Sequence, residues 1–181
     1  MSGLQNQKQI GFTIVELLIV IVVIAILAAI TVVSYNGIQT RANNTMAVRE
    51  VAQWTKIFET YKAQEGSYPV MNDGGYCLGK DFPIGGGGVR RCRDYEGTGV
   101  SAYLESGNTV LMDELNKAAT ASAGNKVPVS GTVGPYAEYT STTISVITIL
   151  RGSSSDVCEP PTKYSWTDGS TRVICRVLLY R

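Results

Sequence analysis

A single carboxylate, Glu16, lies near the start of an apolar stretch that covers residues 12–33. An ionisable side chain at membrane depth costs about 2.5–3.5 kcal/mol at mid-span and somewhat less near a helix end. A desolvated carboxylate is tolerated when it is paired with an opposite charge. The position of Glu16 therefore predicts a functional ion pair, and the positive group has to be found elsewhere.

The composition offers few residues for catalysis. The chain of 181 residues has no histidine, which excludes Ser-His-Asp and Cys-His nucleophile arrangements and removes the commonest zinc and haem ligand. Asp156, Glu159 and Asp168 lie near the C-terminus, but their spacing matches no calcium-binding loop. We expect a protein that is not an enzyme, with no catalytic residue, no cofactor and no metal site.

The formal net charge of +1 gives no overall attraction to nucleic acid or to an acidic surface. Any electrostatic role must therefore be local. At this length we expect one modest globular domain besides the apolar segment.

The four cysteines favour disulfides over a metal or redox site, because none of them forms a Cys-x-x-Cys pair. Four cysteines allow three connectivities. We favour the two local bridges because short loops close readily, each contributing about 3 kcal/mol in the chain-entropy model. Free thiols and a four-thiolate metal site remain alternatives. Disulfides predict a domain outside the reducing cytosol, and the bridges favoured are Cys77 with Cys92 and Cys158 with Cys175.

The apolar stretch is long enough to cross a membrane. Its 22 residues would form about 33 Å of helix, against roughly 30 Å of hydrocarbon core. A cleaved secretory signal has a shorter apolar core and a more basic start, and a plain anchor does not explain Glu16. Positive charge is nearly balanced between Lys8 on one side and Arg41 and Arg49 on the other. The prediction that the C-terminal domain is extracytoplasmic therefore rests on the disulfides.

The sequence of residues 11–20, GFTIVELLIV, resembles the N-terminus of the type IV pilin and pseudopilin family. Precursors in that family have a short leader that ends in glycine, then phenylalanine, with a glutamate at the fifth position of the mature chain. Gly11, Phe12 and Glu16 occupy these positions here. The close match extends over about residues 11–35, and beyond it the similarity is one of architecture.

The resemblance implies a leader of residues 1–11, cleavage between Gly11 and Phe12 by a prepilin peptidase, and N-methylation of Phe12. It also implies that Glu16 meets the terminal amine of a neighbouring subunit, which supplies the missing positive group. The expected partners are further copies of the chain in a filament built through the N-terminal helices, the assembly platform in the membrane, and minor pilins. The protein would be single-pass in the membrane before assembly and at the cell surface afterwards.

The helix is predicted to continue beyond the membrane, so that residues 12–35 form the filament core and residues 36–66 an amphipathic continuation. One apolar stripe recurs at steps of three and four. The glycine at 66 and the proline at 69 predict the end of the helix. Two separate helices hinged near Asn36 and Gly37 are the alternative. The stripe consists of Ala47, Val51, Trp54, Phe58 and Tyr61.

The globular head is predicted over residues 67–181 and begins with an irregular, glycine-rich segment at 71–107. This segment holds the only basic cluster, Arg90, Arg91 and Arg93. These arginines are candidates for contact with DNA phosphates, but two acidic residues follow at once and no aromatic ladder accompanies them. We therefore expect a solvated or subunit-contacting loop and no nucleic-acid partner.

A short helix near residues 113–121 precedes an antiparallel sheet at 142–181. Its strands are predicted at 144–150, 163–166 and 173–180, with a turn at 168–169. One face of the sheet should pack on the stripe that contains Trp54 and Phe58. The predicted fold class is α+β and pilin-like: a long N-terminal helix packed on a small antiparallel C-terminal sheet.

Three functions remain open at this point. The first is a structural subunit of a type IV pilus-like surface filament for adhesion, twitching motility or DNA uptake. The second is a minor pilin or a type II secretion pseudopilin. The third is a membrane-anchored module that binds DNA or a glycan through residues 85–93.

Overall fold

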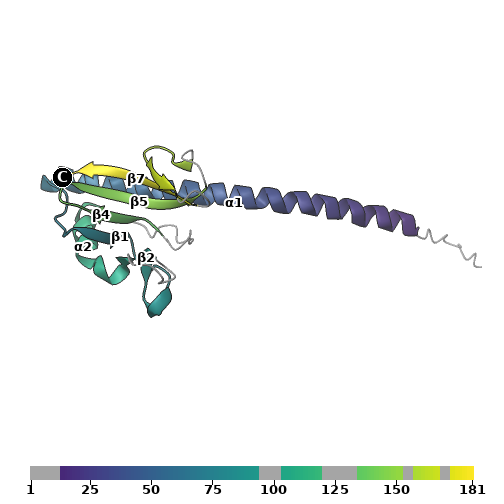
Figure 1. The fold of residues 1–181 in the computed structure, drawn as a ribbon, viewed down its shortest axis with the longest axis horizontal. Coiled ribbons are helices and arrows are strands. Elements are labelled where there is room, and N and C mark those ends of the chain that lie inside the picture. The colour runs from purple at the N-terminus through teal and green to yellow at the C-terminus, as the bar shows by residue number, and fades with distance from the viewer. Residues whose placement is uncertain (1–12, 94–102, 120–133, 153–156, 168–171) are drawn as a thin grey trace, which may run out of the picture. The chain divides into compact units, whose positions relative to one another are not determined.

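The computed structural model describes residues 13–93, 103–119, 134–152, 157–167 and 172–181 (Figure 1). The chain divides into two units, residues 1–39 and residues 40–181, and we call the second the head unit. The elements in chain order are α1 (Ile14–Glu65), β1 (Gly74–Cys77), the 3₁₀ turn Gly86–Gly88, β2 (Arg91–Arg93), β3 (Tyr103–Leu104), the 3₁₀ turn Glu105–Gly107, α2 (Thr109–Ala118), β4 (Tyr136–Tyr139), β5 (Thr143–Arg151), β6 (Lys163–Thr167) and β7 (Arg172–Tyr180).

Helix α1 is one helix rather than two and ends at the predicted position. Gly66 follows its last residue with a φ of 82°, in the left-handed region that glycine reaches without strain. Its N–H group donates to the carbonyl of Lys62 at 2.9 Å. The prediction of a continuous helix that stops at this glycine is confirmed.

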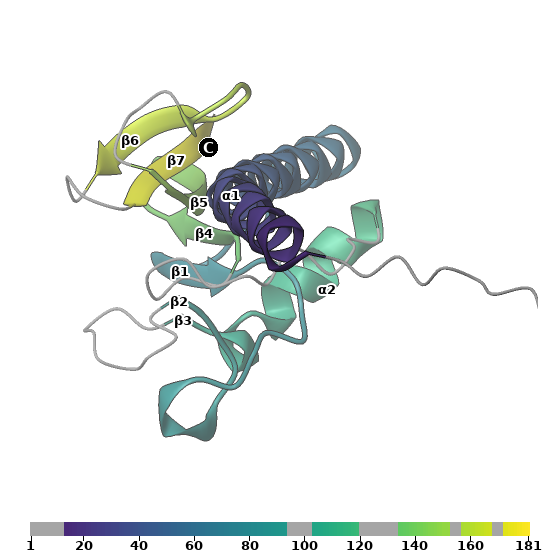
Figure 2. The ribbon, with the colours of Figure 1, turned by 90° about the vertical axis from the view of Figure 1, so that its right-hand side faces the viewer.

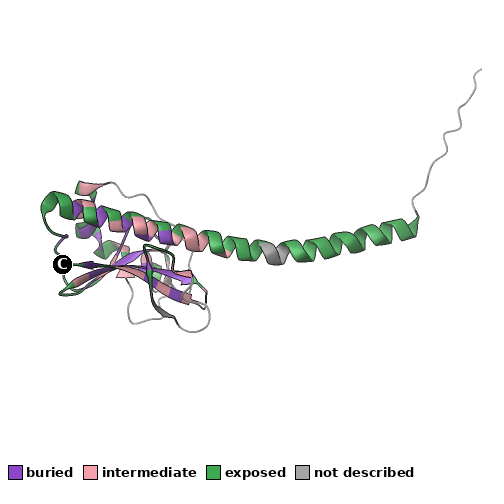
Figure 3. Ribbon diagram, turned by 90° about the horizontal axis from the view of Figure 1, so that it is seen from above, coloured by how far each residue is buried: buried purple, intermediate pink, exposed green. Residues whose placement is uncertain are grey.

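The burial of α1 changes along its length (Figure 3). The large apolar side chains between Ile14 and Ile30 are all exposed in the isolated chain. Inside the head unit the predicted stripe is buried from Val51 onward, with Val51 and Phe58 fully inaccessible and Trp54 2 % exposed, while Ala47 is partly buried. An apolar helix without a polar face therefore gives way to an amphipathic helix with one buried face.

Five antiparallel strands form the sheet in the order β1-β4-β5-β7-β6. Strands β5 and β7 are central and pair over nine residues, from Thr143 opposite Tyr180 to Arg151 opposite Arg172. The three predicted strands are confirmed, and α2 begins four residues before its predicted start. Strands β1 and β4 were not predicted. Each has only four residues, and two of those in β1 are glycines, so neither shows an alternating pattern.

The sheet is buried on both faces. On one face Ile144, Val146 and Leu179 pack with the α1 stripe and with Leu111 and Leu115 of α2, and Figure 2 shows both helices on this side. On the opposite face, a second cluster gathers around the paired residues Tyr136 and Ile147. The predicted packing of the sheet on α1 is therefore confirmed.

Polar contacts also attach α1 to the sheet. The side-chain amide of Asn44 donates to the carbonyl of Arg151 at 2.8 Å, and its oxygen accepts from the Arg151 N–H at 3.0 Å. The amide thereby satisfies both backbone groups at the end of β5. These two bonds fix the start of the packed part of α1 against the end of a central strand.

Replacing Phe58 by alanine tests the packing of α1 on the sheet. The ring is fully buried and lies 6.5 Å from the rings of both Tyr68 and Tyr139. We expect Phe58→Ala to lower the free energy of unfolding by about 3–5 kcal/mol, through lost burial and the cavity that remains. Tryptophan fluorescence of the full-length chain in detergent, followed through a urea titration, measures the change.

The matched control is Lys56→Ala, two residues away on the exposed face of the same helix. It should change the free energy by less than about 0.5 kcal/mol. Equal urea midpoints for Phe58→Ala and Lys56→Ala would show that this stripe does not support the head unit.

Candidate functional site

The first candidate site lies at the start of α1, where Thr13 and Glu16 form a capping box. The carboxylate Oε2 of Glu16 accepts the Thr13 N–H at 2.9 Å and the Thr13 hydroxyl at 2.7 Å. In return, the Thr13 hydroxyl oxygen accepts the Glu16 N–H at 3.2 Å. The pattern Thr-x-x-Glu at a helix start is the sequence signal for this arrangement. The prediction that Glu16 needs a partner from another chain did not take this capping box into account.

The capping box reduces the free-energy cost of placing the Glu16 carboxylate in apolar surroundings. Two donors from its own chain already contact one carboxylate oxygen, so the carboxylate is hydrogen-bonded where its surroundings are apolar. Both of these bonds go to Oε2, and among the described residues no bond to Oε1 is found. The predicted cleavage site, Gly11 and Phe12, lies outside the described residues.

The apolar surface of residues 14–30 surrounds Glu16. Its large side chains are 47–84 % exposed, and α1 is long and apolar enough to cross a membrane by length and composition. Such an uninterrupted surface is stable in lipid or against other apolar helices. The arrangement therefore presents one carboxylate oxygen on a surface that is otherwise apolar.

The head unit contains two disulfides. Cys77 is bonded to Cys92 and Cys158 to Cys175, which are the two local bridges that the spacing favoured. The first joins β1 to β2 on the face of the sheet opposite α1, and the second joins the segment before β6 to β7 beside Val48 of α1. Each face of the sheet thus has one covalent cross-link.

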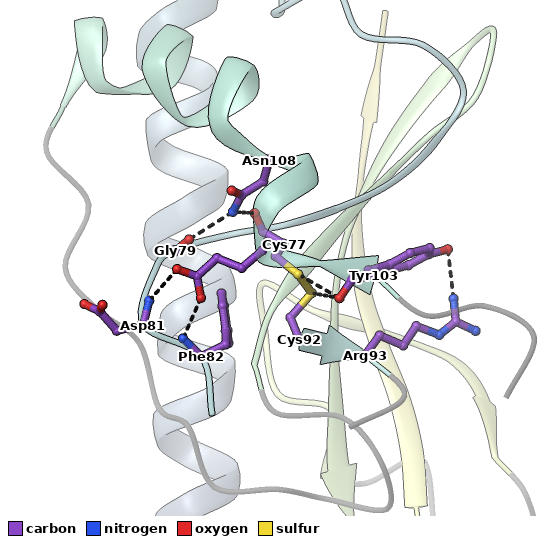
Figure 4. The surroundings of a disulfide bond; sticks show 9 residues. Cys77, Gly79, Asp81, Phe82, Cys92, Arg93, Tyr103 and Asn108 are labelled. Carbon is purple, nitrogen blue, oxygen red and sulfur yellow. Dashed lines mark hydrogen bonds between the residues drawn. A yellow bond between two sulfur atoms is a disulfide. The ribbon is translucent and has the colours of Figure 1, made fainter. Parts of the chain in front are cut away.

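A polar cluster lies beside the first disulfide (Figure 4). The Tyr103 hydroxyl donates to Glu138 at 2.8 Å and accepts from Arg93 at 2.9 Å, and Arg93 forms an ion pair with Glu138 at 2.8 Å. Burial, together with the hydrogen bond to Glu138, raises the pKa of Tyr103 to about 12. Tyr103 therefore stays protonated as a donor across the physiological pH range.

The Tyr103 ring lies over Gly75, at a point where any Cβ would overlap the ring. Gly75 pairs with Glu138 across β1 and β4, so the ring and its hydroxyl contact both members of one cross-strand pair. No sequence pattern could have revealed this contact, because the two residues are far apart along the chain.

Arginines of the basic cluster form hydrogen bonds and an ion pair inside the head unit. The guanidinium of Arg90 donates to the Phe82 carbonyl at 2.6 Å, and that of Arg93 is paired with Glu138 and lies 5.0 Å from the centre of the Tyr103 ring. Arg91 lies half-buried between them on β2. DNA contact stays an untested prediction, and the guanidinium groups of Arg90 and Arg93 are already bonded inside the head unit.

Residues before α2 fix the loop that follows β1. The Asn108 amide donates to the carbonyls of Cys77 and Gly79 at 2.7 and 3.0 Å, and the Glu105 carboxylate accepts the N–H groups of Asp81 and Phe82 at 3.0 and 2.8 Å. A surface pocket of about 550 Å³ opens beside these residues.

No three His, Cys, Asp or Glu side chains gather into a metal-binding group within the described ranges. Of the three acidic residues near the C-terminus, Glu159 is described and exposed. Asp156 and Asp168 lie outside the described residues.

Comparison with known proteins assigns the N-terminal segment. Residues 6–32 match the family model "Prokaryotic N-terminal methylation motif", which includes the predicted cleavage site and the capping box. Residues 6–32 therefore carry an N-terminal methylation motif. This match confirms that the N-terminal segment carries the motif on which the resemblance to pilins and pseudopilins was based.

Curated proteins match part of the chain. The chain is 34 % identical to the type II secretion system core protein G of Escherichia coli over 69 residues, 38 % of this chain and 48 % of the relative. It is 41 % identical to the type IV wide pilus major component PilA4 of Thermus thermophilus over 65 residues, 36 % of this chain and 48 % of that protein. The chain thus spans about half the length of these relatives, and no solved structure matches it.

Replacing Gly75 by alanine tests the contact between Tyr103 and the sheet. The added Cβ would displace the ring and with it the bonds to Arg93 and Glu138. We expect Gly75→Ala to destabilise the head unit by about 1–3 kcal/mol, the range for overpacking at a filled site. Urea denaturation of the oxidised full-length chain in detergent provides the measurement.

Gly107→Ala is the matched control, because a Cβ there meets nothing within 4 Å. It should leave the urea midpoint nearly unchanged. If the two alanine variants were equally stable, the Tyr103 ring would not depend on the glycine beneath it.

Proposed function

We propose that the chain is the structural subunit of a type IV pilus-like surface filament. It is stored in the membrane, cleaved after Gly11 by a prepilin peptidase, and polymerised through its N-terminal helix by an assembly platform. The observation that carries the proposal is the methylation motif over residues 6–32 together with the apolar surface of α1. Adhesion, motility and DNA uptake are the roles such a filament would serve.

The geometry of Glu16 supports a role in assembly. Thr13 donates two hydrogen bonds to Oε2 of Glu16, and within the described residues Oε1 receives none. A terminal amine on Phe12 of a neighbouring copy would be a charge of the right sign, and a charged pair within an apolar interface would fix the register of helices that otherwise slide. The two disulfides suit a head unit outside the cytosol.

A type II secretion pseudopilin is the second candidate. It is favoured by the relatives from Escherichia coli and Aeromonas hydrophila, both named as type II secretion system core protein G. Both functions would use the same cleavage of the leader and the same assembly through the N-terminal helix. They differ in where the assembled filament is located. The amount of the chain in sheared surface filaments separates them, since a major pilin dominates that fraction.

Mass spectrometry of the mature N-terminus tests the proposed processing. We expect the first residue of the protein from sheared filaments to be N-methylated Phe12, because the peptidase would cut after Gly11 and modify the new terminus. The membrane fraction of a strain without the peptidase is the control and should retain Met1. Filaments whose subunits start at Met1 would contradict the proposal.

Glu16→Ala tests the assembly contact. Loss of one member of a buried charged pair costs about 3–5 kcal/mol, so we expect cleavage to proceed while the filament yield falls by more than about tenfold. Immunoblots of sheared and membrane fractions measure both quantities.

Thr13→Ser is the matched control, because serine keeps the hydroxyl of the capping box. It should assemble like the native chain. Normal filament yield from Glu16→Ala would remove Glu16 from the mechanism.

A further inference from the structure

The two disulfides of the head unit differ in their access to solvent. Cys77 and Cys92 are both completely inaccessible. In the second bridge Cys175 is inaccessible too, but Cys158 is half-buried. Reduction begins when a thiolate attacks one sulfur of the bridge. A reductant can therefore approach the second bridge from the Cys158 side. Neither cysteine of the first bridge is accessible to solvent.

The burial of the first bridge has identifiable causes. Phe82, Tyr136 and Ile147 form an apolar cluster with its two cysteines. The Tyr103 carbonyl oxygen lies 3.2 Å from the Cys77 sulfur and 3.8 Å from the Cys92 sulfur (Figure 4). These are packing contacts, because a disulfide sulfur has no hydrogen to donate. Tyr103 thus covers both sulfur atoms with its backbone.

The side chain of Tyr103 holds this backbone in place. Its ring lies against Gly75 and contacts the Tyr136 ring edge-on at 5.2 Å. Its hydroxyl joins the ion pair between Arg93 and Glu138. To move Tyr103 away from the sulfurs, the ring must leave the glycine and both hydroxyl bonds must break.

We propose that Tyr103 is a cover that controls chemical access to the Cys77–Cys92 disulfide. In the presence of a dithiol reductant the Cys158–Cys175 bridge is reduced first, and the bridge between β1 and β2 survives until Tyr103 leaves Gly75. The inference rests on the geometry of the head unit alone and holds whether or not the chain forms filaments.

The reaction that the cover delays is ordinary thiol–disulfide exchange. One thiolate of the dithiol attacks a protein sulfur, the sulfur–sulfur bond breaks, and the other protein sulfur leaves as a thiolate. The second thiol of the reagent then displaces the attached protein sulfur. The reagent ends as a cyclic disulfide and the protein as two thiols.

Charge around the bridge also opposes the attack. An incoming thiolate would lose its hydration in the apolar cluster, which is unfavourable for an anion without a partner. Figure 4 draws Arg93 in the surroundings of the bridge, and its guanidinium is already paired with Glu138. The cover therefore acts through exclusion and desolvation together.

The test follows each bridge separately in the oxidised full-length chain in detergent. The chain is exposed to dithiothreitol under native conditions, quenched at intervals with iodoacetamide, and analysed by peptide mass spectrometry at all four cysteines. We expect the Cys158–Cys175 bridge to be reduced at least about tenfold faster, because the other needs local opening first. Equal rates, or the reverse order, would overturn the proposal without any variant.

Variants then identify the cover. Tyr103→Ala should speed reduction of the Cys77–Cys92 bridge about tenfold and leave the Cys158–Cys175 rate unchanged, which also serves as an internal control for unfolding. Tyr103→Phe keeps the ring over Gly75 and should have a smaller effect.

Gly75→Ala displaces the ring while leaving Tyr103 itself in the chain, and it should also speed reduction of the Cys77–Cys92 bridge selectively. If both Tyr103→Ala and Gly75→Ala left that rate unchanged, or raised the rates of both bridges equally, Tyr103 would not be the cover.

Discussion

The burial of one stripe of α1 against the antiparallel sheet is the interaction on which the rest of the head unit depends. Val51, Trp54 and Phe58 are almost completely inaccessible, and they contact side chains from the central strands and from α2. Hydrophobic burial is the main favourable term in folding, and here it joins elements from both ends of the chain. Without this contact, one face of the sheet would lose the helix that it packs on.

The same helix also has to accommodate a carboxylate where its surface is wholly apolar. The capping box with Thr13 does this locally, since it supplies two donors to Glu16 and satisfies one N–H group at the helix start. The proposed pairing with a neighbouring amine is therefore not the only source of stabilisation for Glu16. In this view assembly adds a partner to an oxygen that is already positioned.

The described parts of the glycine-rich segment, residues 71–93 and 103–107, are held by side-chain contacts between positions well separated along the chain. Asn108 and Glu105 hold the loop after β1, Arg90 bonds to its Phe82 carbonyl, and a disulfide joins β1 to β2. A cross-link in a loop with many accessible conformations reduces the entropy of the unfolded chain. The covalent bond and the side-chain bonds together make a defined surface from a sequence with little local preference.

The sequence by itself determined what depends on neighbours along the chain. The stripe at helical spacing, the stop at Gly66, the three long strands and the fold class all follow from local periodicity and local steric preference, and the short spacing of the cysteines favoured the observed bridges. The motif around Glu16 also identified the family, although the Thr13 partner was visible in the sequence and was overlooked.

Only the tertiary structure decided what depends on residues far apart in sequence. Strands β1 and β4 are too short to show a pattern; β4 pairs with the edge of β5, and β1 pairs in turn with β4. The position of the Tyr103 ring over Gly75 and the use of Arg93 inside the fold depend on the register between strands. That register is set by packing across the whole sheet, so no window of the sequence contains it.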